Sequence, residues 1–182
     1  MKRLFFLVCF LSGVLTSAAQ RTYSSNEGDV SIFSETPLEN IDAHNTSIKA
    51  LLNTFTRDVG FIVPIRKFKF RKAMMEEHFN EKYMESDKFP MATFKGRLNE
   101  PVDFSKEGET KVTSTGKLSM HGVERDVTCP GTVLVKNGEI EMKSEFNVLV
   151  KDYNITIPKL VVQNISENIA VKVNVKFIPY KK

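Results

Sequence analysis

Tryptophan is absent from this sequence of 182 residues, and cysteine occurs only twice. Nine glycines and seven prolines are too few for a collagen-like or low-complexity chain. With 41% hydrophobic and 26% charged residues, the composition also excludes bulk disorder. At this length we expect a single globular domain, and its fourteen phenylalanines are the main aromatic material for a core.

No hydrophobic run is long enough to span a bilayer, which takes about 20 helical residues. The longest run, Leu4–Leu15, follows the basic pair Lys2 and Arg3 and precedes the small residues Ser17–Ala19. That order is typical of a signal peptide. We therefore predict a signal peptide over residues 1–19, cleaved near Ala19, one domain over residues 20–182, and a periplasmic or secreted protein.

Loss of the signal peptide leaves Cys129 as the only cysteine, which excludes an intramolecular disulfide. It also lowers the formal net charge of +4 by two, because Lys2 and Arg3 leave with it. The one basic cluster, residues 66–72, is too short to indicate nucleic-acid binding. Interleaved with Phe68 and Phe70, it could contact an anionic membrane surface, or it could be a solvated strand end that leads into a helix.

Apolar and polar residues alternate with period two along most of the remaining chain. Such alternation is typical of antiparallel strands with one buried face. Asn137-Gly138 joins two of these segments and is a strong hairpin signal, and His121-Gly122 predicts a second tight turn. Two weaker strands are expected around residues 30–35 and 41–53. The clean segments span residues 57–66, 92–98, 112–120, 127–135, 140–150 and 169–177.

One segment, residues 71–84, breaks this alternation. Met75, Phe79 and Tyr83 recur at a spacing of four and predict one face of a helix of three to four turns. Its solvent face would carry Glu76, Glu77, Glu81 and Lys82.

About eight antiparallel strands leave two architectures open, a two-sheet sandwich and a closed barrel. Gly96, Gly116 and Gly131 occupy inward positions of long strands, where glycine allows the coiling that closure needs. An eight-stranded barrel is either filled by side chains or holds one small ligand. Periodicity alone is compatible with both interiors.

Three motifs, in order, resemble those of the YceI-like family. They are residues 75–96, with the His78-Phe79 and Phe89-Pro90 pairs, residues 116–127 around His121-Gly122, and residues 146–158 around Asp152-Tyr153. The resemblance extends over about residues 59–177. It implies an all-β fold, an eight-stranded antiparallel lipocalin-like barrel with one short helix at about residues 71–84. It also implies export and the binding of a polyisoprenoid or quinone-like lipid in the barrel.

A site of this kind needs no chemical motif, because burial of apolar surface alone contributes about 25 cal/mol per Å². The inward apolar side chains are then either core or the lining of a lipid tunnel. With the resemblance, we predict the second and expect no cofactor. The predicted ligand-binding residues are Phe61, Val63, Phe94, Leu118, Met120, Phe146 and Val148.

Catalysis and metal binding have little support in the sequence. His44, His78 and His121 are far apart, with no helical i, i+4 pair and no accompanying cysteine or carboxylate, so we expect no metal site. We expect His78 to cap the helix or to pack it on the barrel, and His121 to order its turn through a hydrogen bond. Cys129 lies at an inward, apolar position, where burial makes a thiol inert, although a nucleophile is the alternative.

Three functions therefore stay open. The first is an exported carrier of an isoprenoid lipid, without catalysis. The second is an envelope interaction protein that uses the barrel exterior through an exposed apolar patch, for which a homodimer is one form. The third is an enzyme acting on a lipid-like substrate, which needs a titratable pair inside the cavity.

Overall fold

The computed structural model describes residues 22–35, 40–157 and 166–180, so the predicted signal peptide lies outside the described residues. The chain is mostly strand. The strands are β1 (Thr22–Ser25), β2 (Gly28–Ser34), β3 (Ile41–Asn45), β4 (Lys49–Asn53), β5 (Asp58–Pro64), β6 (Lys69–Phe70), β7 (Met91–Leu98), β8 (Gly108–Met120), β9 (Val123–Lys136), β10 (Glu139–Leu149) and β11 (Asn168–Pro179).

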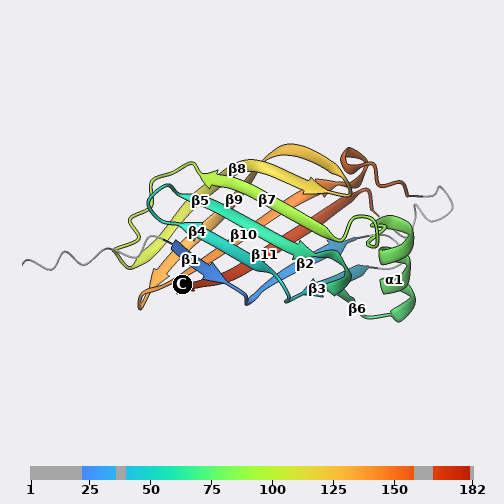
Figure 1. Ribbon diagram of the computed structural model, residues 1–182, viewed down its shortest axis with the longest axis horizontal. Helices are drawn as coiled ribbons and strands as arrows, with labels where there is room; N and C mark the ends of the chain where they lie inside the picture. Colours follow the sequence, from blue (N-terminus) through green and yellow to red (C-terminus); the bar gives the residue numbers. More distant parts are fainter. Residues whose placement is uncertain (1–21, 36–39, 158–165, 181–182) are drawn as a thin grey trace, which may run out of the picture.

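Every strand pairing is antiparallel, and the sheet closes on itself through β1 and β11. The closed ring runs β1-β4-β5-β7-β8-β9-β10-β11 and contains eight strands. At the other end of the molecule, β2, β3 and β6 continue from β11 beside the helix α1 (Ala73–His78) (Figure 1). The predicted eight-stranded antiparallel barrel is confirmed, and the sandwich is excluded.

Three of the eight strand paths are broken in two, which gives β1–β2, β3–β4 and β5–β6. The second break occurs after Asn45, which is fully buried. Its side-chain oxygen accepts a hydrogen bond from the Ser47 N–H (2.9 Å), and its amide nitrogen donates to the Pro64 carbonyl (2.8 Å). Asn45 therefore joins the kink of one path to the kink of the next, since Pro64 ends β5 before the 3-10 turn η1 (Ile65–Lys67).

Both predicted two-residue turns are present. Asn137-Gly138 links Lys136 to its partner Glu139, and His121-Gly122 links Met120 to Val123. All four turn residues have positive φ, between 50° and 77°. This is the type I′ geometry that suits the twist of a hairpin, and it explains why asparagine, histidine and glycine stand there.

The predicted helix is α1, followed directly by a π-helical turn, η2 (Phe79–Tyr83). The change is visible in the Met84 N–H, which donates to the Phe79 carbonyl five residues earlier (2.8 Å). No residue of α1 or η2 is fully buried, and the pair lies across one end of the barrel (Figure 1).

The two ends of the barrel are packed differently. At the end away from α1, six side chains with 0–1% exposure fill the interior: Leu52, Leu98, Val133, Ile140, Val175 and Phe177. Toward α1, many inward apolar side chains are only half-buried, and a second small cluster around Met84, Val148 and Tyr153 lies beside them. The interior is therefore solid at the closed end and open toward the helix.

Candidate functional site

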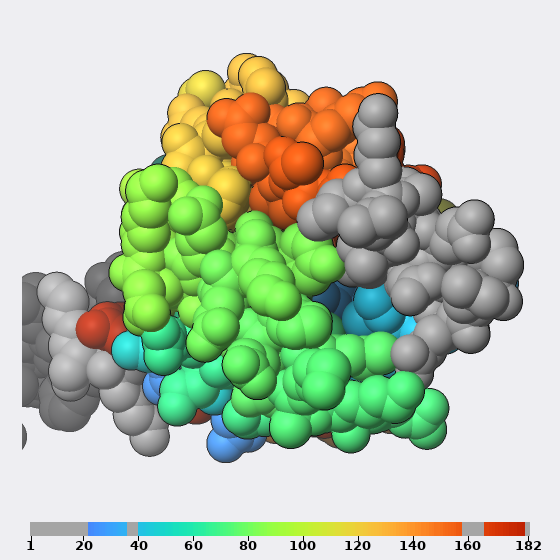
Figure 2. Space-filling view, turned by 90° about the vertical axis from the view of Figure 1, so that its right-hand side faces the viewer, coloured from blue at the N-terminus to red at the C-terminus, as the bar shows by residue number. Residues whose placement is uncertain are grey.

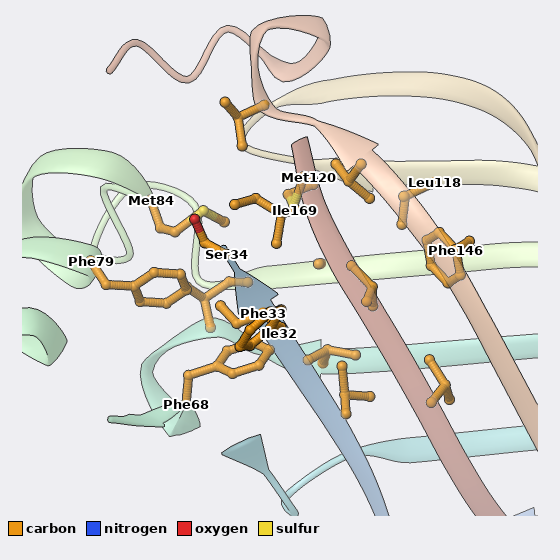
Figure 3. Close-up of a pocket in the computed structure, with 18 of the residues that line it drawn as sticks. Ile32, Phe33, Ser34, Phe68, Phe79, Met84, Leu118, Met120, Phe146 and Ile169 are labelled. Carbon is orange, nitrogen blue, oxygen red and sulfur yellow. The ribbon is translucent and has the colours of Figure 1, made fainter. Parts of the chain in front are cut away.

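A cavity of about 370 Å³ occupies the barrel between its packed end and α1–η2. This volume lies in the range of about 300–1,000 Å³ that small-molecule sites have. Figure 3 shows Phe79 pointing from the helix toward Ile32 and Phe33 of β2, with Leu118 and Phe146 on strands farther along the barrel. Seen from the helix end, the surface is hollowed beside α1, and residues of β2 and β3 are visible in the hollow (Figure 2).

All seven residues predicted from the sequence border this cavity. Six of them, all except Val148, are only half-buried although they point into the barrel. Inward apolar side chains that keep accessible surface are what an unfilled apolar cavity produces, because a packed core would cover them. The seven are Phe61, Val63, Phe94, Leu118, Met120, Phe146 and Val148.

The structure adds lining residues that the sequence analysis did not select. Phe68 and Phe70 carry a signal that could have identified them, since they alternate with lysines at period two. Met84 and Ile155 lie in irregular segments, where no periodicity exists to indicate their direction. The additional apolar lining residues include Ile32, Phe33, Phe68, Phe70, Met84, Ile155, Ile169, Val171 and Val173.

β9 and β10 stop pairing beside the cavity, and Pro130 explains where the pairing ends. The Ser144 hydroxyl donates to the Pro130 carbonyl (2.6 Å), so this carbonyl faces β10. In an antiparallel strand the backbone nitrogen and the carbonyl of one residue point to the same neighbouring strand. The nitrogen of Pro130 therefore also faces β10, and as a proline nitrogen it has no hydrogen to donate. The β9–β10 ladder ends one residue later, at the pair Gly131 and Ser144. Past this point the 3-10 turn η3 (Val150–Tyr153) packs against β9.

Polar groups are few on the cavity wall, and most of them are satisfied. Ser144 donates to Pro130, and Ser114 lies 3.5 Å from the Cys129 carbonyl as a weak donor. His78 and Tyr83, on α1 and η2, are the titratable groups that the helix contributes. Burial raises the pKa of the Tyr83 phenol, so it is neutral and able to donate a hydrogen bond at physiological pH.

Cys129 borders the cavity and is buried. Desolvation raises the pKa of its thiol to about 11 from 9.0. The thiolate is the nucleophile, and it is scarce at neutral pH, as expected for an inert structural cysteine.

Because the pKa of the Cys129 thiol is about 11 and not 9.0, we expect slow alkylation of this residue. At pH 8 the thiolate fraction should be about 100-fold lower than that of a thiol with the ordinary value. Reaction of the chain from Gln20 onward with N-ethylmaleimide, followed by mass spectrometry between pH 7 and 10, should show rates that rise tenfold per pH unit throughout. A plateau below pH 9 would contradict this environment.

His121 joins three segments at the helix end of the barrel. Its Nδ1 donates to the Tyr153 carbonyl (2.9 Å), and its Nε2 lies 2.9 Å from a carboxylate oxygen of Glu85. The Phe89 ring packs against it at 4.5 Å between centroids. His121 therefore makes hydrogen bonds from its turn, and they reach η3 and the segment that follows η2; that they order the turn stays a prediction.

We expect His121→Ala to lower the free energy of unfolding by about 1–3 kcal/mol, since it leaves a buried carbonyl without its donor. The midpoint of urea denaturation measures the loss. Glu85→Gln keeps a hydrogen-bonding side chain at the exposed side of the contact, and it should cost less than half as much. Equal losses for the two variants would show that the Tyr153 bond contributes little.

Among the described residues, no group of three or more His, Cys, Asp or Glu side chains is placed to hold a metal ion. His44 lies on the surface between Asp29 (3.3 Å) and Asp42 (3.4 Å), as a local ion-pair group. No helix among residues 22–35, 40–157 and 166–180 has the length and apolar character to cross a membrane.

Comparison with known proteins gives one family. The model of the YceI-like domain matches residues 13–177. Among curated proteins, none matches the chain.

Solved structures share the fold at low sequence identity. A polyisoprenoid binding domain from Saccharophagus degradans, implicated in plant cell wall breakdown, is 12% identical with a TM-score of 0.73, over 88% of this chain and 99% of that one. BcnA from Burkholderia cenocepacia is 15% identical with a TM-score of 0.70, over 82% and 95%. A YceI protein from Campylobacter jejuni is 16% identical with a TM-score of 0.56, over the full length of both chains.

Proposed function

Because the chain belongs to the YceI-like family, we propose that it is an exported lipid-binding protein that sequesters or carries an isoprenoid or quinone-like amphiphile in its barrel. The observation that carries the proposal is the apolar cavity beneath α1–η2, lined by half-buried phenylalanine, methionine and aliphatic side chains. The domain from Saccharophagus degradans that shares this fold is described as polyisoprenoid binding, which supports the choice of ligand.

Burial is sufficient to hold such a ligand. A tail that loses roughly 300 Å² of apolar surface to the cavity would gain about 7.5 kcal/mol, before the costs of association are subtracted. Isoprenoid tails are branched at regular intervals, and the mixture of aromatic, thioether and small side chains suits an irregular hydrocarbon. The affinity then depends on apolar contact area and not on a particular polar partner.

We propose that binding involves no bond making or breaking. The titratable side chains bordering the cavity in the described part of the chain are His78, Tyr83, Cys129 and Lys143. Cys129 has a raised pKa, and Lys143 forms an ion pair with Glu141 (3.2 Å). This set supports carriage and offers no activated nucleophile.

Uptake of a defined lipid by delipidated protein tests the proposal. The protein from Gln20 onward is extracted with solvent, refolded and mixed with a polyprenol or an isoprenoid quinone below its aggregation concentration. Co-elution of one lipid per protein on gel filtration is the expected result. No uptake of either lipid by correctly folded protein would overturn it.

A second function is favoured by an observation on the barrel exterior. Ser24 of β1 pairs with Leu51 of β4 on one side and Ile178 of β11 on the other. Both flanking side chains are more than half exposed, at 53% and 57%. Two outward apolar side chains on the strands that flank β1 form the kind of surface that a protein partner or a second copy would cover. An envelope interaction protein, including a homodimer, is therefore the alternative function.

Light scattering of Leu51→Lys against the native chain distinguishes a self-associating protein from a monomer.

A further inference from the structure

The segment that closes the helix end of the barrel has two chemically different faces. Phe68 and Phe70 point inward and border the cavity. Lys67, Lys69 and Arg71 alternate with them and are exposed. A cationic outer surface is thus separated from an apolar cavity by the thickness of one strand. We call the five basic residues of this segment the basic rim: Arg66, Lys67, Lys69, Arg71 and Lys72.

The basic rim is only partly neutralised by the side chains around it. Arg66 forms an ion pair with Asp87, and Lys69 forms one with Glu76 at 2.6 Å. No acidic side chain in the described ranges lies within salt-bridge distance of Lys67 or Arg71. The segment itself contains no acidic residue. At least two positive charges therefore stay available to an external anion.

Apolar surface adjoins this charge. Met74, the second residue after Lys72, lies at the start of α1 and is 67% exposed. Segments that bind at the boundary of a bilayer combine lysine and arginine with apolar side chains, and Met74 supplies one exposed apolar side chain beside the basic rim. The loops at the opposite end of the barrel, residues 54–57, 99–109 and 136–139, carry five acidic and three basic side chains. In the described part of the chain, the run of five basic side chains within residues 66–72 lies at the helix end, although α1–η2 beside it also carries Glu76, Glu77 and Glu81.

We propose that the basic rim and Met74 dock the barrel on an anionic lipid bilayer, with the helix end facing the membrane. The inference rests on the proposed function, since docking there brings the cavity beside α1 within reach of a lipid leaving or entering the bilayer. Charge selects the surface, and Phe68 and Phe70 lead from the same segment into the cavity. The partner is the phospholipid head-group layer, because it combines the negative charge that the basic rim attracts with an apolar layer that can bury Met74.

The test is co-sedimentation with vesicles at low salt. The native protein should bind vesicles of equal parts phosphatidylcholine and phosphatidylglycerol and not vesicles of phosphatidylcholine alone, and high salt should release it. Each basic residue near an anionic surface contributes roughly fivefold to binding, so Lys67→Gln/Arg71→Gln should bind about 30-fold more weakly. The matched control, Lys106→Gln/Lys136→Gln, removes the same charge from the opposite end and should bind like the native protein.

Equal weakening by the two double variants would overturn the proposal, because net charge and not the basic rim would then control binding. Absence of binding by the native protein would also overturn the proposal. So would displacement of the protein from the vesicles by inorganic phosphate at constant ionic strength, because the rim would then bind phosphate and not a bilayer. The cavity variant Phe146→Glu separates docking from carriage: it should still bind vesicles although it cannot take up lipid. Loss of vesicle binding by this variant, if it is folded, would contradict docking through the rim.

Discussion

Phe146→Glu is expected to abolish lipid uptake, with a loss of affinity of at least about 100-fold, or roughly 2.7 kcal/mol. Phe146 is half-buried on β10 and points into the cavity. A carboxylate at this position needs water or a partner, and an apolar tail would have to remove that water. Titration of delipidated protein with an isoprenoid quinone, followed by gel filtration, measures the change.

Two control variants test whether the loss of lipid affinity is specific to a charge inside the cavity. Asn147→Glu places the same charge on the next residue of β10, which faces solvent, and it should leave lipid affinity unchanged. Phe146→Leu keeps the wall apolar and should stay within a few-fold of the native chain. If Asn147→Glu and Phe146→Glu have the same lipid affinity, and both have the unfolding midpoint of the native chain, the ligand does not occupy this cavity.

Gly116→Ala is expected to destabilise the barrel by about 3 kcal/mol, which for a domain of this size lowers the unfolding midpoint by about 10 °C. Gly116 of β8 is paired with Gly96 of β7. A Cβ at Gly116 would overlap the Lys95 carbonyl oxygen and the Cα of Gly96, which are backbone atoms. The only relief is separation of β7 from β8, so the whole ladder is affected.

Gly60→Ala on the neighbouring strand β5 is the matched control. The nearest atom to its Cβ would be the Phe94 carbonyl oxygen at 3.7 Å, an ordinary contact. This substitution should change stability by less than about 1 kcal/mol, and it reduces the freedom of the unfolded chain. Thermal unfolding followed by circular dichroism compares the two variants. Equal midpoints would show that close approach of β7 and β8 is not required for closure.

The regular part of the fold could be predicted because period-two alternation is a direct consequence of strand geometry. It identified the long strands β7–β11 and both two-residue turns, and the inward glycines were compatible with the closed barrel that the family resemblance implied. The first strands were less clear, because β1–β2 and β3–β4 are each broken. The buried Asn45 that holds one of these kinks looks like an ordinary polar residue until Pro64 is placed beside it.

The site was predictable only in part, for a physical reason. Alternation shows which side chains point inward, and this was enough to find seven residues that border the cavity. It does not show whether a neighbour covers them, because that depends on contacts between distant segments. The opening of β9 from β10 at Pro130, the π-helical turn at Phe79 and the positions of Met84 and Ile155 have no periodic signature. Together they shape the cavity.

Lipid carriage is tested by native mass spectrometry of the protein purified from the envelope of its own host, with solvent extraction of whatever is bound. Carriage predicts a stoichiometric adduct of several hundred daltons or more that extracts as an isoprenoid lipid. A clean mass of the protein alone, with no adduct after incubation with a polyprenol or a quinone, would contradict carriage and favour a partner bound to the barrel exterior.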